Sequence, residues 1–457
     1  MMKYKVTCNN PTKLSLVLNE SSSKSPGNFY STFTSTFSDQ LNNSVARDLV
    51  AIGQGIFLSD RSFKRDSRIG NKTRELVLEL PVENEALWNK VKWRIEDWAK
   101  FVSHDVWRIR FVQAKQGKKL KAEQVDSFKK TPVVCLFSDG LDSLCGALYA
   151  LKAKDEPIFV SHTPPGFQTA QDTIEKLKEK FNLSDSPTHH ATFRFLARDI
   201  DPKSGKRNMM TEYSRRTRPV LYLSLAGAVA LETGASEVRL NENGWMAINL
   251  PTAFQKSGSD ISRHAHPEML RIFEGLLNAI APTGRKIIVN NPFDNLTKGE
   301  EVTSLVSVPD LVSNTMSCAY GRRQMARIRN FSAKKNTKAL KECGLCIPCL
   351  VRRAAVFKAG ISEDVMHYAY SLTDSSRSTG STKKKPLLGI IQGNVEELTA
   401  FSNRIKKMSK REFALTYIYE LSLLAPEPKK VESVIKNAYD INQRFATEFL
   451  AFQRKSS

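Results

Sequence analysis

The stretch that decides the fold is residues 132–154, PVVCLFSDGLDSLCGALYALKAK. An apolar run leads into a short turn of small and acidic residues, and a second apolar run follows at helical spacing. This order predicts a buried strand, a tight turn and a helix that packs against the strand.

The turn in this stretch combines groups that suit a phosphate. Gly140 lets the backbone approach an anion because it has no Cβ, and Ser138 and Ser143 offer hydroxyl groups. The start of the following helix offers unpaired N–H groups with a partial positive charge. Asp142 stands near that start, where it could cap the helix or bind magnesium. A strand, a Ser/Gly turn and a capped helix also occur together without a ligand, so the turn alone leaves both interpretations open.

Strands and helices alternate from this stretch onward. Helical patterns at 169–181 and 218–234 separate apolar runs that are typical of strands. The predicted strands are residues 132–137, 157–162, 188–195, 236–242 and 286–292. This βαβα order predicts an α/β fold with a parallel, Rossmann-like sheet covered on both faces. Ligands of such sheets bind at the carboxyl ends of the strands.

Further regions flank this core. Residues 74–81 alternate as a half-buried strand does, and 83–103 place Trp88 and Trp98 on one apolar helix face. The last helix carries a long apolar face, which we expect to pack on the body of the protein or to form an oligomer interface. The expected parts are an N-terminal α+β accessory domain (1–120), a core domain (130–362), a linker or loop (363–386) and a C-terminal helical segment (387–457).

Composition narrows the class of protein. The 457 residues carry a formal net charge of +22, and 41% are hydrophobic. A charge of this sign attracts polyanions such as nucleic acid, nucleotide phosphates or an acidic protein, although it also serves solubility alone. The opening segment MMKYKVTCNN lacks the apolar run of a signal peptide, and no apolar run is long enough for a bilayer. We therefore expect a cytoplasmic protein with no membrane partner.

Four cysteines fall late in the chain with the spacing of metal ligands. Three of them follow one another at intervals of two residues, which lets neighbouring thiolates meet on one ion. The predicted metal ligands are Cys318, Cys343, Cys346 and Cys349. Four thiolates leave no open position, so the site is predicted to be structural, with zinc as the metal. An iron–sulfur cluster and a set of buried free thiols are the competing interpretations.

Two motifs carry a resemblance to a known family. The turn SDGLDS resembles the S-G-G-x-D-S signature of the PP-loop ATP pyrophosphatases, with Asp139 where that family has glycine. The segments CGLCIPCLVRRAAVFKAG, RPVLYLSLAGAVA and LTKGEEV resemble stretches of QueC, the 7-cyano-7-deazaguanine synthase family, over residues 130–362. These matches place Arg352, Arg218, Lys298 and Glu300 on positions of the family pattern.

The chain also departs from that family. No segment matches the YPDCR stretch of its substrate loop, and NENGWMAINLPTAFQKSGSDISRHAHPEM stands there instead. Residues 1–120 have no counterpart in the shorter family members. In both respects the chain is similar to the long defence-associated QueC-like proteins, namely the QatC component of Qat anti-phage systems and its relatives.

The resemblance implies a reaction and its cofactors. QueC-like enzymes use ATP and Mg²⁺ to adenylate the carboxylate of 7-carboxy-7-deazaguanine and then let an amine displace AMP. The implied acceptor is the N-terminal amine of an operon-encoded partner protein; nucleic acid is a possible partner but is not required. The implied nucleotide-binding residues are Ser138, Asp139, Gly140, Leu141, Asp142 and Ser143. The implied catalytic residues are Asp142, Lys298 and Arg218.

The substrate pocket is predicted from position. Glu242 and Asn243 follow a predicted strand at the carboxyl edge of the sheet, where a carboxylate could accept the N–H groups of a guanine-like ring. His264 and His266 could position the substrate carboxylate or the amine. Each of these residues also has a structural alternative, because NENG is a turn-forming sequence and loop histidines often bond the backbone.

Other functions remain open at this point. Ammonia in place of a protein amine would make the chain a 7-cyano-7-deazaguanine synthase. A PP-loop tRNA-modifying enzyme would suit the positive charge, but such enzymes usually need catalytic cysteines outside the metal cluster. In a third alternative Asp139 repels phosphate, and the chain is an inactive nucleotide-binding module.

Overall fold

The computed structural model describes residues 3–8, 15–19, 28–35, 41–63, 65, 73–114, 128–138, 140–162, 170–185, 188–200, 212, 216–253, 263–319, 342–366, 368–372, 386–425 and 427–456.

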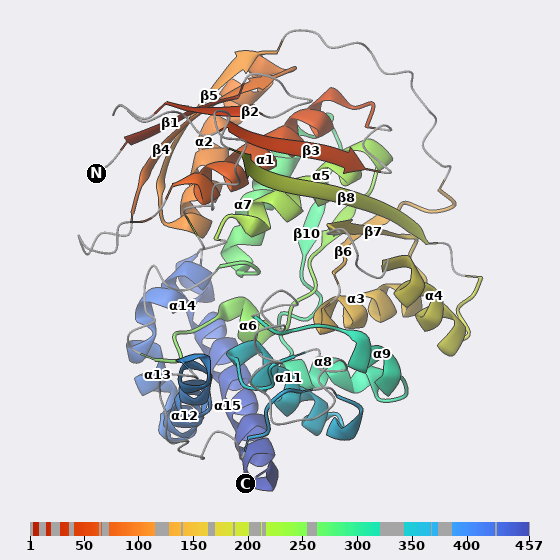
Figure 1. The fold of residues 1–457 in the computed structure, drawn as a ribbon, viewed down its shortest axis with the longest axis vertical. Helices are drawn as coiled ribbons and strands as arrows, with labels where there is room; N and C mark the ends of the chain where they lie inside the picture. The colour runs from red at the N-terminus through yellow and green to blue at the C-terminus, as the bar shows by residue number, and fades with distance from the viewer. Residues whose placement is uncertain are drawn as a thin grey trace.

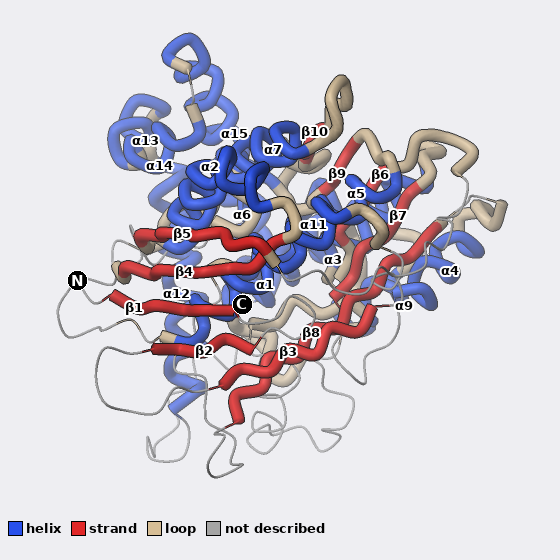
Figure 2. The backbone as a smooth tube through the Cα atoms, turned by 90° about the horizontal axis from the view of Figure 1, so that it is seen from above, coloured by secondary structure: helices blue, strands red, loops and turns tan. Residues whose placement is uncertain are grey.

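A ten-stranded sheet runs through the molecule in the order β10-β9-β6-β7-β8-β3-β2-β1-β4-β5 (Figures 1 and 2). Its strands are β1 (Lys3–Cys8), β2 (Ser15–Asn19), β3 (Asn28–Ser35), β4 (Glu75–Val82), β5 (Val106–Gln113), β6 (Val133–Leu136), β7 (Pro157–His162), β8 (His189–Ile200), β9 (Glu237–Arg239) and β10 (Ile288–Asn290). The five strands from β10 to β8 are parallel to one another, which confirms the predicted α/β class.

The helices follow the same alternation. They are α1 (Ser44–Ser62), α2 (Glu85–Ser103), α3 (Leu141–Lys152), α4 (Ala170–Lys180), α5 (Arg218–Thr233), α6 (Gly244–Ile248), α7 (Pro267–Ile280), α8 (Lys298–Val302), α9 (Pro309–Asn314), α11 (Ile347–Lys358), α12 (Pro386–Lys407), α13 (Lys410–Thr416), α14 (Ile418–Leu424) and α15 (Val431–Ser456). In the described residues, no helix is both long and apolar enough to cross a membrane.

Both faces of the parallel strands are covered, as the sequence predicts. Successive side chains of a strand point to opposite faces. Val134 and Ile158 therefore pack in one core with α1, α5 and α7, whereas Val133 and Phe159 pack in another with α3, α4 and α9. Figure 1 shows α3 and α5 on opposite sides of β6 and β7.

The N-terminal strands and helices join the core without a gap in packing. Strand β3 pairs antiparallel with β8, from Asn28 opposite Ile200 to Ser35 opposite Phe193. The predicted apolar face of α2 is buried, and its Trp98 ring lies 4.7 Å from the ring of Phe273 in α7. The boundary near residue 120 stays a prediction, but α1 and α2 share one hydrophobic core with α5 and α7.

The C-terminal helices form a second layer beside the metal-ligand cysteines. The apolar face of α15 is buried against α11 and α12, as expected for packing on the body of the protein. Its Phe445 ring stacks 3.8 Å from the ring of Trp245 in α6. Part of the predicted linker is also packed, since Tyr368 and Leu372 are buried, while residues 373–385 lie outside the described residues.

Candidate functional site

The predicted phosphate turn lies between β6 and α3. Ser143 Oγ accepts a hydrogen bond from the Ser138 amide at 3.0 Å, and the two serine hydroxyls are 2.9 Å apart. The Gly140 amide donates to Ser138 Oγ at 3.2 Å. Gly140 occupies the N-cap of α3, so no side chain at this position covers the positive end of the helix. Asp139, predicted to belong to the turn, lies outside the described residues.

A buried ion pair stands beside this turn. Lys298, the first residue of α8, is 7% exposed and donates to Asp142 in the first turn of α3. Burial disfavours the Asp142 carboxylate, but the Lys298 charge and the side-chain hydrogen bonds to this carboxylate together hold the Asp142 pKa well below its usual range. Burial also disfavours the Lys298 ammonium, but the neighbouring carboxyl groups, Asp142 foremost, raise the pKa of Lys298. The structure therefore brings together two residues from separate motifs.

Asn243 links this pair to Glu242. The Asn243 side-chain amide donates to Asp142 Oδ1 at 3.2 Å and to Glu242 Oε1 at 2.8 Å. Its carbonyl oxygen accepts from the Met246 amide at 3.0 Å and caps α6. The capping role and the predicted site role thus belong to the same side chain.

Glu242 faces His264 across the carboxyl edge of the sheet. His264 Nε2 lies 3.2 Å from Glu242 Oε2. Burial and the charge of Asp142 raise the pKa of Glu242, while the His264 contact opposes that rise. A carboxyl group, an amide and an imidazole are therefore adjacent at this edge, and their role in a substrate pocket stays a prediction.

His266 has a different position. Its Nδ1 accepts the Glu268 amide at 3.1 Å and caps α7, and its ring lies 5.2 Å from the Phe101 ring. Burial and the charges of Arg263 and Arg271 lower the pKa of His266 to about 3, so the ring is neutral at physiological pH. His266 therefore has the structural role that the sequence left open for a loop histidine.

Arg218 is exposed at the start of α5. Its Nε donates to the Tyr222 hydroxyl at 2.6 Å, and its guanidinium carbon lies 4.9 Å from the centre of the Tyr222 ring. None of the contacts described for Arg218 joins it to Asp142 or Lys298.

Glu301 is a member of the cluster that the sequence did not reveal. It is 2% exposed, and burial and the charge of Asp142 raise its pKa well above the usual range. A protonated Glu301 can donate to Asp142. Glu300, the residue that the QueC resemblance selects, instead caps its own helix through Thr297 and pairs with Arg444 at 3.3 Å. Helical spacing is the sequence signal that could have found Glu301. Lys298 and Glu301 are three residues apart and share one face of α8, whereas consecutive residues lie on different faces.

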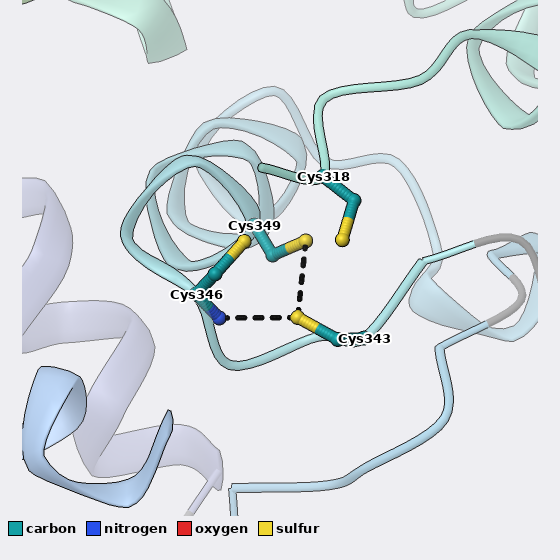
Figure 3. Close-up of side chains that lie close together, drawn as sticks. All are labelled: Cys318, Cys343, Cys346 and Cys349. Carbon is teal, nitrogen blue, oxygen red and sulfur yellow. Dashed lines mark hydrogen bonds between the residues drawn. The ribbon is translucent and has the colours of Figure 1, made fainter. Parts of the chain in front are cut away.

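The four predicted metal ligands converge (Figure 3). Their sulfur atoms lie within 4.8 Å of one another, and all four side chains are buried. Cys343 Sγ and Cys349 Sγ are 3.9 Å apart. Tetrahedral zinc with Zn–S bonds of ~2.3 Å requires sulfurs about 3.8 Å apart, so this set fits one such ion. In an iron–sulfur cluster whose four thiolates each bind a different iron, the sulfur atoms would lie further apart. The four cysteines could therefore hold a single metal ion such as zinc.

Arg352 contacts the segment that supplies Cys318. This arginine is 1% exposed; it donates to the Thr315 hydroxyl at 2.7 Å and lies 3.3 Å from the Glu342 carboxylate. Glu342 in turn accepts the Cys318 amide at 3.0 Å. Such outer contacts orient metal ligands.

The same segment passes over the phosphate turn. The Met316 carbonyl oxygen would lie 3.8 Å from a Cβ placed on Gly140. The metal ligands therefore fix a segment that borders the candidate anion site, which is what a structural metal would do there.

Comparison with protein-family models, with curated proteins and with solved structures found no match for this chain.

Proposed function

We propose that the carboxyl edge of β6 and β9 is a PP-loop site that binds ATP and Mg²⁺ and transfers the adenylyl group to the carboxylate of a 7-deazaguanine. One observation carries this proposal: the turn of Ser138, Gly140 and Ser143 lies beside the buried Lys298–Asp142 pair. An anion-binding turn, a buried cation and a carboxylate are together what a metal-bound triphosphate requires.

Each residue of the turn has a role in phosphate binding. The amides of the first turn of α3 and the two serine hydroxyls bind phosphate oxygens. Lys298 acts as a point charge that stabilises the departing pyrophosphate. When Lys298 turns to phosphate, the carboxylate of Asp142 is released and, with phosphate oxygens, would hold Mg²⁺. The metal supplies charge neutralisation at the phosphates.

Glu242 and His264 form the substrate end of the site. A Glu242 carboxylate can accept both the N1–H and the exocyclic amine of a guanine-like ring. The substrate carboxylate oxygen attacks the α-phosphorus, and pyrophosphate leaves. An amine then attacks the acyl carbon, AMP leaves, and the amine proton passes to a base, for which His264 is the candidate.

The acceptor is proposed from the family resemblance. The segment beginning at Asn241 replaces the substrate loop of the ammonia-using enzymes, which supports a larger acceptor such as the N-terminal amine of a partner protein in anti-phage defence. Cys135 and Cys145 do not support a thiol-transfer reaction. Burial raises the pKa of Cys135 to about 12 and that of Cys145 well above its usual range, so neither is a ready nucleophile.

Exchange of labelled pyrophosphate into ATP tests the adenylation step. We expect exchange only when 7-carboxy-7-deazaguanine and Mg²⁺ are present, and a loss of about 100-fold in Ser138→Ala/Lys298→Met. Glu83→Gln is the control, because Glu83 makes an exposed pair with Arg47. Acid-independent exchange, or full exchange in the double variant, would contradict the assignment. Intact-mass measurement of the partner protein, with ammonia as the second arm, then identifies the acceptor.

A further inference from the structure

A cleft lies outside the cluster just described. It has a volume of about 610 Å³ and is formed by α2, α7 and α14, which belong to the N-terminal, core and C-terminal parts of the sequence. Figures 1 and 2 show these helices on the same side of the molecule. Residues of the lining that carry the argument are Trp93, Arg94, Phe101, His104, Arg263 and Tyr419.

Arg263 places a buried positive charge in this cleft. It is 8% exposed, and its guanidinium donates to the Phe101 carbonyl at 2.8 Å and to the Tyr419 hydroxyl at 3.4 Å. Both acceptors are neutral, and none of the acidic residues described by the structure forms an ion pair with it. A buried charge is costly unless an opposite charge compensates it. The cleft therefore has the electrostatics of an anion site.

The acidic residues that line the cleft do not supply that compensation. Asp105 is bound by Arg74 and Arg65, and Glu268 is bound by Arg271. Asp97 is exposed at the rim. The positive charge of Arg263 is thus left for a ligand.

His104 adds a neutral polar group to the cleft wall. Its Nε2 is buried and, among the described residues, has no hydrogen-bond partner. Burial and the charges of Arg263 and Arg216 lower the pKa of His104 to about 4, so the ring is neutral at pH 7. A neutral imidazole beside an arginine can donate to or accept from an anionic ligand.

Aromatic rings form the mouth of the cleft. Trp93 is 55% exposed and Tyr419 is 53% exposed, and the Arg94 guanidinium lies 4.3 Å from the centre of the Trp93 ring. Exposed rings with neighbouring arginines stack on nucleobases. We propose that this cleft binds a nucleoside monophosphate, with its phosphate on Arg263 and its base on Trp93 or Tyr419. The cleft volume is in the range of small-molecule sites.

Two consecutive residues connect the cleft with the candidate active site. Arg263 lines the cleft, and the adjacent His264 contacts Glu242 at 3.2 Å. A ligand that orders Arg263 therefore also orders the imidazole at the sheet edge. The nucleotide cleft itself does not depend on the proposed adenylation.

Trp93 is a local reporter for the test. The other four tryptophans, Trp88, Trp98, Trp107 and Trp245, are at most 5% exposed. AMP and GMP are titrated into the full chain while the fluorescence of Trp93 and its quenching by acrylamide are followed, and calorimetry measures binding independently. Adenosine and inorganic phosphate are titrated in separate experiments, and both are expected to bind at least tenfold more weakly than a nucleoside monophosphate.

Variants separate this cleft from the phosphate turn. Arg263→Gln is expected to weaken binding at least tenfold, and Trp93→Ala at least threefold by calorimetry, with the Tm of each variant measured first. Trp93 is exposed, so its variant tests the cleft even if Arg263→Gln unfolds. Glu83→Gln alters an exposed pair with Arg47 outside the cleft; it is the control and should leave the titration unchanged. No saturation by either monophosphate, equal binding by phosphate alone, or unchanged binding in Trp93→Ala would overturn the proposal. Loss of binding in Ser138→Ala/Ser143→Ala with Arg263→Gln unaffected would place the ligand at the phosphate turn and would overturn it as well.

Discussion

Replacing Lys298 with methionine tests whether one cation stabilises the carboxyl groups of the candidate site. Lys298 is 7% exposed, and Asp142, Glu242 and Glu301 all raise its pKa. Removing it leaves these groups without a cation, which is expected to lower the free energy of unfolding by about 3–5 kcal/mol. Asp142→Asn is expected to cost less, about 1–3 kcal/mol, because Lys298 keeps two acidic neighbours.

Urea unfolding at pH 7 of both single variants and of the double variant measures the difference between the costs of Lys298→Met and Asp142→Asn. The loss in free energy of unfolding of the double variant is expected to be about 1–3 kcal/mol smaller than the sum of the two single-variant losses, because the two residues are in direct contact. Arg444→Met removes an exposed partner of Glu300 and is the matched control, with a change of no more than about 0.5 kcal/mol. A cost for Asp142→Asn equal to that of Lys298→Met, or strict additivity, would refute the central role of Lys298.

Three further predictions concern other features. Glu301→Gln is expected to match the wild type near pH 4 and to become the more stable protein as the pH rises, because a raised pKa makes the folded wild type keep a proton that the unfolded chain releases. Unfolding at several pH values checks this, and a constant difference would contradict it. Cys346→Ser is expected to abolish a content of about one zinc ion per chain, measured by elemental analysis after dialysis; a retained ion would disprove the four-thiolate site. Gly146→Ala is expected to destabilise by about 1–3 kcal/mol, because its Cβ would meet the Asn241 side chain at 2.1 Å. Gly393→Ala, with no neighbour within 4 Å, is the control and should stabilise by up to about 1 kcal/mol in the same thermal melts.

The local elements were predictable from the sequence because short-range patterns determine them. The strand, turn and helix around Gly140 follow from apolar periodicity and from small residues at the turn. The three closely spaced cysteines similarly indicated a metal site, and Cys318 completed the set as expected. The buried face of α2 follows from helical spacing in the same way.

Long-range arrangements were not predictable in the same way. The pairing of β3 with β8 depends on which edge of the sheet is free, and no local pattern encodes that choice. The choice between Glu300 and Glu301 depends on the exact start of α8, since one residue of helix rotation exchanges their positions. The cleft around Arg263 needs three elements that are far apart in the chain.

The β3–β8 pairing also affects synthesis on the ribosome. β8 begins about 150 residues after β3 ends. At ~5–20 residues per second, β3 waits on the order of ten seconds for its neighbour to emerge. An open strand edge can pair with other chains during that interval. Nascent or truncated chains that stop before His189 should therefore recruit chaperones or aggregate, whereas chains that reach Ile200 can close the edge.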